Sequence, residues 1–159
     1  MKRGLVVLYK ITGILVGLFS YLMLFSCLTG LFAKGPEGVI VMCLFVAACM
    51  VIYSTLSSLF VRLVLTQKQP MRYSLKDWIK VNAYVSVLFN GLLLFSAVAV
   101  LANPSSVAQL LKEHPESIAP YTIDQFWSLI KGLLVIAALV CIHCVWTLRL
   151  VKRFRDYFK

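Results

Sequence analysis

The segment Cys141-Ile142-His143-Cys144 holds the side chains of this sequence best suited to chemistry. A C-x-x-C pair can act as a redox couple or supply half of a zinc site. The histidine lies between the cysteines rather than after them, so the haem-attachment motif C-x-x-C-H is absent. A zinc site needs four ligands, and the sequence has no second Cys or His cluster. We therefore expect Cys141 and Cys144 to be structural, with redox or metal chemistry as alternatives and no cofactor.

A second set of polar residues interrupts apolar sequence. Asn82, Ser86 and Asn90 are spaced four residues apart, so they share one face of a helix. Lipid offers an amide no hydrogen-bond partner, so these side chains are expected to face other helices. His143 should lie at a depth similar to that of Asn82, and the two are expected to be able to hydrogen-bond. The set is either a packing contact or part of a polar cavity for substrate or protons.

The elements that position these residues are membrane-spanning helices. The chain has 159 residues and is 61% hydrophobic, whereas soluble domains are roughly half apolar. Its charges gather between long apolar runs. The sequence predicts an all-α polytopic membrane protein, an antiparallel four-transmembrane-helix bundle in one domain. The predicted parts are spans 5–32, 37–65, 75–102 and 123–150, an outer loop 103–122 and a basic tail 149–159 that continues the last helix in the headgroup region.

Local signals mark helix ends and helix contacts. Ser74 with Asp77, and Thr122 with Gln125, form capping-box patterns that predict the starts of the third and fourth spans. Ser105 to His114 could form a short helix in the outer loop. Small residues let helix backbones approach closely, so a first-span seam is predicted for packing within the chain or with a second copy; it consists of Gly13, Gly17 and Ser20.

The distribution of charge predicts the orientation of the bundle. The net charge is +10, and the Lys and Arg residues are concentrated at the start, in the second connection and in the tail. By the positive-inside rule both termini are cytoplasmic. We expect a multi-pass protein of a cell membrane, the bacterial inner membrane, with anionic lipid headgroups at its basic face. Nucleic acid is not an expected partner.

The sequence leaves the function open among three hypotheses. Minimal loops and small-residue seams favour an accessory subunit that packs with other membrane proteins or with itself. The second hypothesis is a small transporter or channel with a path lined by Asn82, Ser86, Asn90 and His143. A carboxylate in the middle of a span, which proton-coupled export usually needs, is missing. The third is a membrane-embedded enzyme acting on lipid or quinone, although the common catalytic motifs are absent.

Two further cysteines carry an open question. Cys27 and Cys43 are predicted to lie at similar depth near the same membrane surface. If that surface is the oxidising one, a disulfide could join them. Otherwise both remain free thiols, which in an apolar run behave as small hydrophobes.

Overall fold

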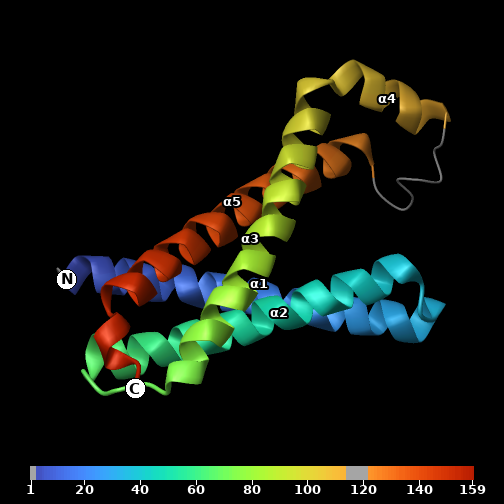
Figure 1. Ribbon diagram of the computed structural model, residues 1–159. Coiled ribbons are helices and arrows are strands. Elements are labelled where there is room, and N and C mark those ends of the chain that lie inside the picture. The colour runs from blue at the N-terminus through green and yellow to red at the C-terminus, as the bar shows by residue number, and fades with distance from the viewer. Residues whose placement is uncertain (1–2, 114–121) are drawn as a thin grey trace.

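The computed structural model describes residues 3–113 and 122–159 and contains four long helices (Figure 1). These are α1 (Arg3–Lys34), α2 (Gly38–Phe60), α3 (Tyr73–Ala102) and α5 (Ile123–Arg153). Helix α2 continues into a short π-helix, η1 (Val61–Thr66), while α4 (Pro104–Glu113) follows α3 and a 3-10 turn, η3 (Arg155–Tyr157), follows α5. All four long helices are apolar enough to span a membrane, so the predicted all-α four-span fold is confirmed.

Two helix ends follow signals that are visible in the sequence. Thr122 Oγ1 accepts a hydrogen bond from the Gln125 backbone N–H at 3.3 Å, and Gln125 Oε1 accepts one from the Thr122 N–H at 2.9 Å. The capping box predicted at the start of α5 is thus confirmed. Helix α1 ends at Lys34 and is followed by Gly35, whose φ of +82° suits glycine and whose N–H donates to Leu31 O at 2.9 Å.

The capping box predicted at Ser74 and Asp77 is wrong. Helix α3 begins at Tyr73, so its N-cap is Arg72, two residues before Ser74, and Arg72 makes no side-chain capping bond. The Tyr73 N–H donates instead to the backbone carbonyl of Lys159 at 2.9 Å. A distant segment of the chain therefore satisfies a backbone donor that the sequence pattern assigned to a local side chain.

The basic tail also departs from its expected form. Helix α5 ends at Arg153, and the tail turns back instead of continuing as a helix. It pairs with the link before α3, since Met71 N–H donates to Tyr157 O at 2.8 Å and Lys159 N–H donates to Met71 O at 3.0 Å. Phe158 is 6% exposed and stacks on Phe60, with ring centroids 5.9 Å apart. Burial of this aromatic ring outweighs continuation of the helix.

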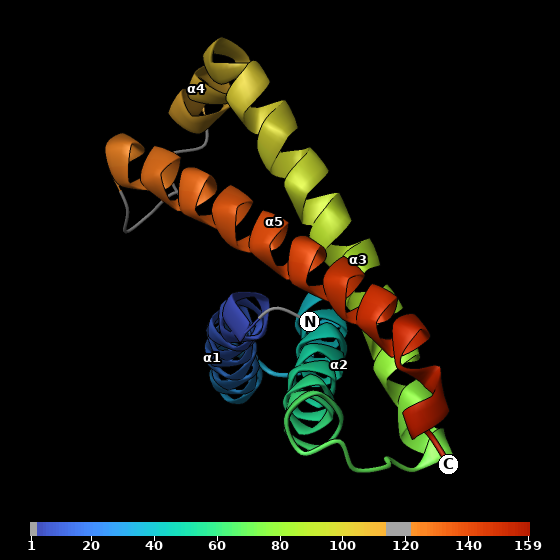
Figure 2. The same ribbon diagram turned by 90° about the vertical axis from the view of Figure 1, so that its left-hand side faces the viewer.

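The helices form two antiparallel pairs, α1 with α2 and α3 with α5, that cross near the end holding both termini (Figures 1 and 2). The pairs diverge toward the opposite end, which carries α4 and the α1–α2 turn. Burial follows this shape: no residue is buried in 21–34, 38–45 or 123–136, and Ala97 alone is buried in 91–102. The apolar core therefore occupies the half of the molecule nearer the termini; we call the other half the open half.

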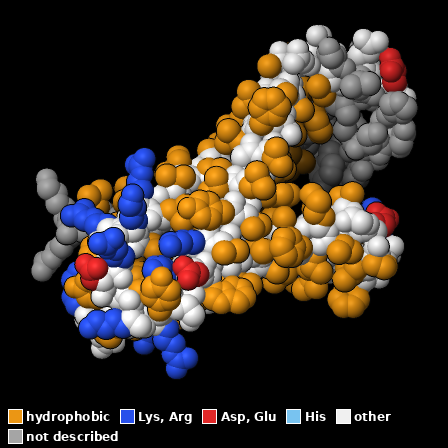
Figure 3. Space-filling model, viewed as in Figure 1, with side chains coloured by type: hydrophobic (Ala, Val, Ile, Leu, Met, Phe, Trp, Pro, Cys, Tyr) orange, Lys and Arg blue, Asp and Glu red, His pale blue; other side chains and the backbone are white. Residues whose placement is uncertain are grey.

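Charge is distributed as unevenly as burial. In Figure 3 the Lys and Arg side chains gather at the end of the molecule that holds the termini. At this end the described basic residues come from α1, from η1 and the link that follows it, from α3, and from α5 and the tail; examples are Lys10, Arg62, Arg72, Lys76, Arg149 and Lys152. We call this region the basic end. Part of the predicted outer loop at the other end, residues 114–121, lies outside the described residues, as do residues 1–2.

Candidate functional site

The most polar buried region of the chain lies where α1, α2 and α5 meet. His143 of α5 is 1% exposed, and its ring stacks on Tyr9 with the centroids 4.6 Å apart. Its Nδ1 lies 3.1 Å from Thr12 Oγ1, and its Nε2 lies 3.5 Å from Ser57 Oγ. The region consists of six residues that we call the hydroxyl–imidazole cluster: Tyr9, Thr12, Tyr53, Ser57, His143 and Thr147.

Thr147 is the hub of this cluster. Its hydroxyl donates to the backbone carbonyl of His143, one turn earlier in α5, at 2.8 Å. A hydroxyl has one proton, so Thr147 must accept from its two other neighbours. Tyr9 donates to Thr147 Oγ1 at 2.5 Å, and Tyr53 donates to the same oxygen at 2.6 Å. One threonine thus joins α5 to α1 and to α2 through phenol hydroxyls.

The remaining protons can be assigned in the same way. Because Tyr9 donates to Thr147, Ser57 donates to the Tyr9 hydroxyl oxygen at 2.8 Å. Thr12 donates to the backbone carbonyl of Tyr9 at 3.0 Å and keeps lone pairs free for an Nδ1–H of His143. Ser57 and Thr12 have then each used their one proton, so an imidazole with a single N–H donates either to Thr12 through Nδ1 or to Ser57 through Nε2, and not to both.

The small-residue seam of α1 permits this close approach. A Cβ added at Gly13 would lie 3.3 Å from His143 Cε1 and 3.5 Å from Nε2. A Cβ at Gly17 would lie 3.6 Å from Ser54 Oγ of α2. Ser20 is fully buried, and its hydroxyl donates to Val16 O at 2.7 Å. The structure therefore places the seam against α2 and α5 of the same chain.

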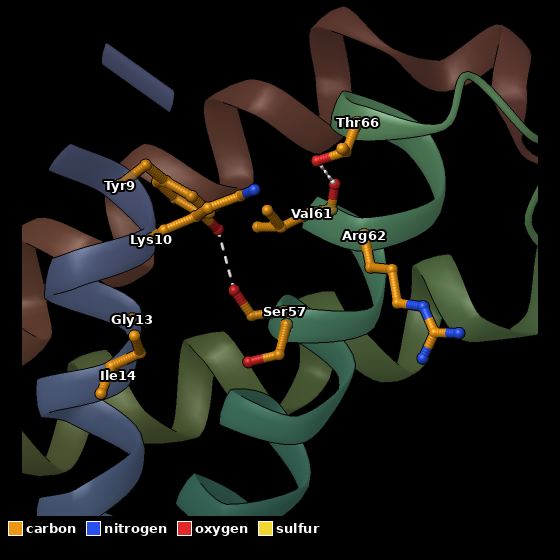
Figure 4. Close-up of a pocket in the computed structure, with 9 residues that line it drawn as sticks. Tyr9, Lys10, Gly13, Ile14, Ser57, Val61, Arg62 and Thr66 are labelled. Carbon is orange, nitrogen blue, oxygen red and sulfur yellow. Dashed lines mark hydrogen bonds between the residues drawn. The ribbon is translucent and has the colours of Figure 1, made fainter. Parts of the chain in front are cut away.

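A cavity of about 270 Å³ adjoins the cluster between α1 and the α2–η1 segment (Figure 4). Tyr9 and Ser57 line it with their hydrogen-bonded hydroxyls, and Ile14 and Val61 provide apolar wall. The Lys10 side chain extends across it toward η1, whereas the Arg62 guanidinium points away from Lys10 (Figure 4). The cavity thus connects the buried hydroxyls to the cationic residues of the basic end.

The polar stripe of α3 is buried as well, and it makes a separate set of bonds. Asn82 Nδ2 donates to Trp78 O at 2.8 Å, and Ser86 Oγ donates to Asn82 O at 2.7 Å. Asn90 Nδ2 donates to Ser86 O at 2.8 Å and lies 3.7 Å from Met50 Sδ, the stripe's contact with α2. Among the described residues, none of these three side chains hydrogen-bonds to the cluster around α5.

Helix backbone therefore satisfies most of the α3 stripe. The four residues proposed as one polar set divide into an α3 group of Asn82, Ser86 and Asn90 and a cluster built around His143. Every buried side-chain nitrogen and oxygen of the described residues has a hydrogen-bond partner. The stripe needs no bound polar molecule to satisfy its amides.

The cysteines are all free thiols. Cys144 is fully buried beside the hydroxyl–imidazole cluster, and Cys141 is half-buried with its Sγ 3.9 Å from Val87 O. Cys27 and Cys43 are half-buried and not joined to each other. Within residues 3–113 and 122–159, no three His, Cys, Asp or Glu side chains converge on a point that could hold a metal ion.

Sequence reasoning about the polar set did not include four of the cluster's residues: Tyr9, Thr12, Tyr53 and Ser57. A signal was present in α1, because Tyr9 lies four residues before Gly13 and extends the same seam. The seam's small residues showed that another helix approaches there. What they could not show was that the approaching side chain is His143 and that phenol hydroxyls meet it.

Chemically, the cluster offers an imidazole, two phenols and three aliphatic hydroxyls in a chain of hydrogen bonds. Comparison of the sequence and structure with protein-family models, curated proteins and solved structures found no match to any of them.

Proposed function

We propose that this small integral membrane protein is an accessory subunit whose open half receives a transmembrane helix of another membrane protein. The supporting observation is the divergence of the two helix pairs (Figures 1 and 2), which leaves helix faces in the open half unburied among the residues that the structure describes. Helices associate in lipid mainly by van der Waals packing of close-fitting surfaces. A helix seated in the open half would supply that packing.

Helix α5 illustrates how a packed stripe runs out into the open half. Its His143 and Val140 are buried against the rest of the bundle. The same helical face continues at Ile136, Gly132 and Leu129, by steps of three or four residues. A Cβ added at Gly132 would meet nothing within 4 Å, and Leu129 is 53% exposed. The face that packs within the chain at one end is available to a partner at the other.

Orientation and location belong to the same proposal. The basic end is placed on the cytoplasmic side by the positive-inside rule, which puts both termini in the cytoplasm. The open half then lies in the outer part of the bilayer of a bacterial inner membrane. A partner helix would enter the open half beneath the outer surface.

An accessory role fits the contacts better than transport or catalysis. The amides of Asn82 and Asn90 are bonded to α3's own backbone, so a polar path along this helix would have to break those bonds. The buried histidine hydrogen-bonds to hydroxyl groups that join three helices. Such an arrangement holds the basic end together while the open half accommodates a partner.

Site-specific photocrosslinking in intact cells tests the proposal. A benzophenone amino acid replaces Leu129, on the inward stripe, and in a matched variant replaces Val135, which is 65% exposed and lies on a different face of α5. The position-129 variant is expected to yield a discrete protein adduct, either with another membrane protein or with a second copy. The position-135 variant is expected to label lipid. Lipid labelling alone at both positions, or equal protein adducts from both, would overturn the proposal.

A second variant checks that the adduct reflects a seated helix. Gly132→Leu fills the space on the inward stripe and should reduce the position-129 adduct severalfold. Because an added Cβ at this position meets no described residue within 4 Å apart from its chain neighbours and its own helix backbone, the variant should keep the thermal stability of the wild type in detergent. An unchanged adduct yield in a folded Gly132→Leu protein would contradict the proposed seat.

A further inference from the structure

A groove of about 510 Å³ runs between α3 and α5 at the basic end. Two helices and the tail contribute cationic side chains to it, while Val145 and Leu148 form its apolar part. The cations are Lys76, Lys80, Arg149, Lys152 and Arg155. None of the residues that line the groove is acidic.

The charges of the groove are poorly compensated. Asp77 lies 3.6 Å from Lys80, and Asp156 lies 3.6 Å from Arg155, but the two carboxylates are 56% and 90% exposed. Solvent-exposed ion pairs of this kind contribute little interaction energy. Lys76 lies 3.7 Å from the centroid of the Tyr73 ring, which attracts a cation without neutralising it. Five cations facing two exposed carboxylates leave the groove with a net positive charge that favours a multivalent anion.

A second groove continues from the first toward the middle of α5. Its volume is about 490 Å³, and it shares Val145 and Arg149 with the cationic groove. Its other lining residues are Cys141, Ile142 and Trp146, so it is apolar beyond Arg149. A phosphate held in the first groove would therefore have a hydrocarbon-compatible track beside it.

We infer that the two grooves together bind one phospholipid that carries two phosphate groups. The phosphates lie among the five cations, and an acyl chain follows the apolar groove past Trp146. Basic recesses between spans on the cytoplasmic side are suited to such headgroups. A lipid headgroup and a soluble phosphate ester would present the same phosphate chemistry to the cations. The apolar groove beside them favours the lipid over free phosphate. This site is separate from the open half and does not depend on the accessory role.

Tryptophan quenching measures occupancy of the apolar groove directly. The chain has three tryptophans, and Trp78→Phe with Trp127→Phe leaves Trp146 as the sole reporter. The protein in detergent micelles is titrated with diphosphatidylglycerol whose acyl chains are brominated. Saturable quenching of Trp146 at low lipid fraction is expected. Brominated phosphatidylcholine at the same fraction should quench no more than non-specific contact with the micelle does.

The groove variant combines Lys80→Gln, Arg149→Gln and Lys152→Gln. Each cation close to an anionic headgroup contributes roughly a fivefold gain in affinity, so this variant should bind about 100-fold more weakly. If the triple variant does not fold, Lys152→Gln alone replaces it and should lose about fivefold.

A matched control removes the same charge from the same end of the molecule outside the groove. It combines Arg62→Gln, Lys68→Gln and Arg72→Gln, none of which lines the groove. The control should keep at least one third of the wild-type affinity. Equal losses in the control and the groove variant would reduce the effect to general surface charge and overturn the inference.

Two competing ligands separate the possible sources of phosphate. Brominated phosphatidylglycerol, with one phosphate, should need a severalfold higher lipid fraction to reach half-maximal quenching; equal potency per molecule would refute the two-phosphate assignment. Soluble glycerol phosphate at millimolar concentration should leave the quenching intact. Full displacement by it would show an anion site without a lipid track and would contradict the inference.

Discussion

Replacement of Thr147 by valine should uncouple three helices while leaving packing almost unchanged. The two side chains have nearly the same shape, and Thr147 is fully buried. Its hydroxyl accepts from Tyr9 at 2.5 Å and from Tyr53 at 2.6 Å. After the substitution Tyr9 keeps its contact with Ser57, whereas Tyr53 loses the hydrogen bond that its hydroxyl makes in the structure.

The expected cost follows from these two lost bonds. Interhelical hydrogen bonds in membrane proteins are worth about 0.6 to 2 kcal/mol each. The Tyr53 phenol is fully buried, so the cost of losing its hydrogen bond to Thr147 should lie near the upper end of that range. We therefore expect Thr147→Val to lower the free energy of unfolding by about 2–3 kcal/mol. Unfolding in mixed micelles at increasing fractions of denaturing detergent, followed by circular dichroism, measures this quantity.

A matched control is available on the outer surface of the α1–α2 pair. Thr55 Oγ1 lies 3.2 Å from the Tyr21 hydroxyl, and both residues are exposed. Thr55→Val removes the same kind of contact between the same residue types, and should cost no more than about 0.6 kcal/mol. A double-mutant cycle with Tyr53→Phe then isolates the buried pair, for which a coupling of about 1 kcal/mol or more is expected. Equal costs at Thr147 and Thr55, together with an additive cycle, would refute the reasoning.

Three further substitutions test other parts of the fold by thermal unfolding in detergent. Gly13→Ala should destabilise the protein by about 1 kcal/mol or more, because the new Cβ would lie 3.3 Å from the immobile His143 ring, whereas Gly91→Ala, with nothing within 4 Å, should be neutral or stabilising. Equal effects at the two glycines would contradict close packing at His143. Phe158→Ala should cost about 2 kcal/mol by removing a ring that is 6% exposed, and an unchanged midpoint would show that the tail does not dock. Asn82→Leu should change stability by less than about 1 kcal/mol, because its amide bonds only to its own helix; a larger loss would reveal a contact to another helix.

The helical content of the chain could be read from the sequence because lipid restricts the choice. A run of apolar residues long enough to cross a bilayer must satisfy its backbone within itself, so four such runs predict four helices. Thr122 and Gln125 likewise act on neighbours three residues away, and their capping box is visible without the fold. Signals that act within one turn of helix need no tertiary information.

Other features required contacts between distant segments. The start of α3 was misassigned to Ser74 because the carbonyl that caps Tyr73 belongs to Lys159, at the far end of the chain. The tail was expected to remain helical in the headgroup region because its sequence is basic and aromatic. Only the fold shows that Phe60 offers a surface on which Phe158 can stack.

The candidate site shows the same division between local and distant information. The types and spacing of Asn82, Ser86 and Asn90 determined that they share one face, and the structure adds that their own helix satisfies most of them. His143 was identified as a buried polar group in need of partners. Which partners it has depended on how α1 and α2 cross α5, because Tyr9 and Ser57 approach from helices that periodicity alone cannot orient about their axes. The sequence therefore determined the spans and their polar residues, while the tertiary structure decided how those residues pair and where the bundle opens, since helix crossing is set by side-chain packing between distant segments.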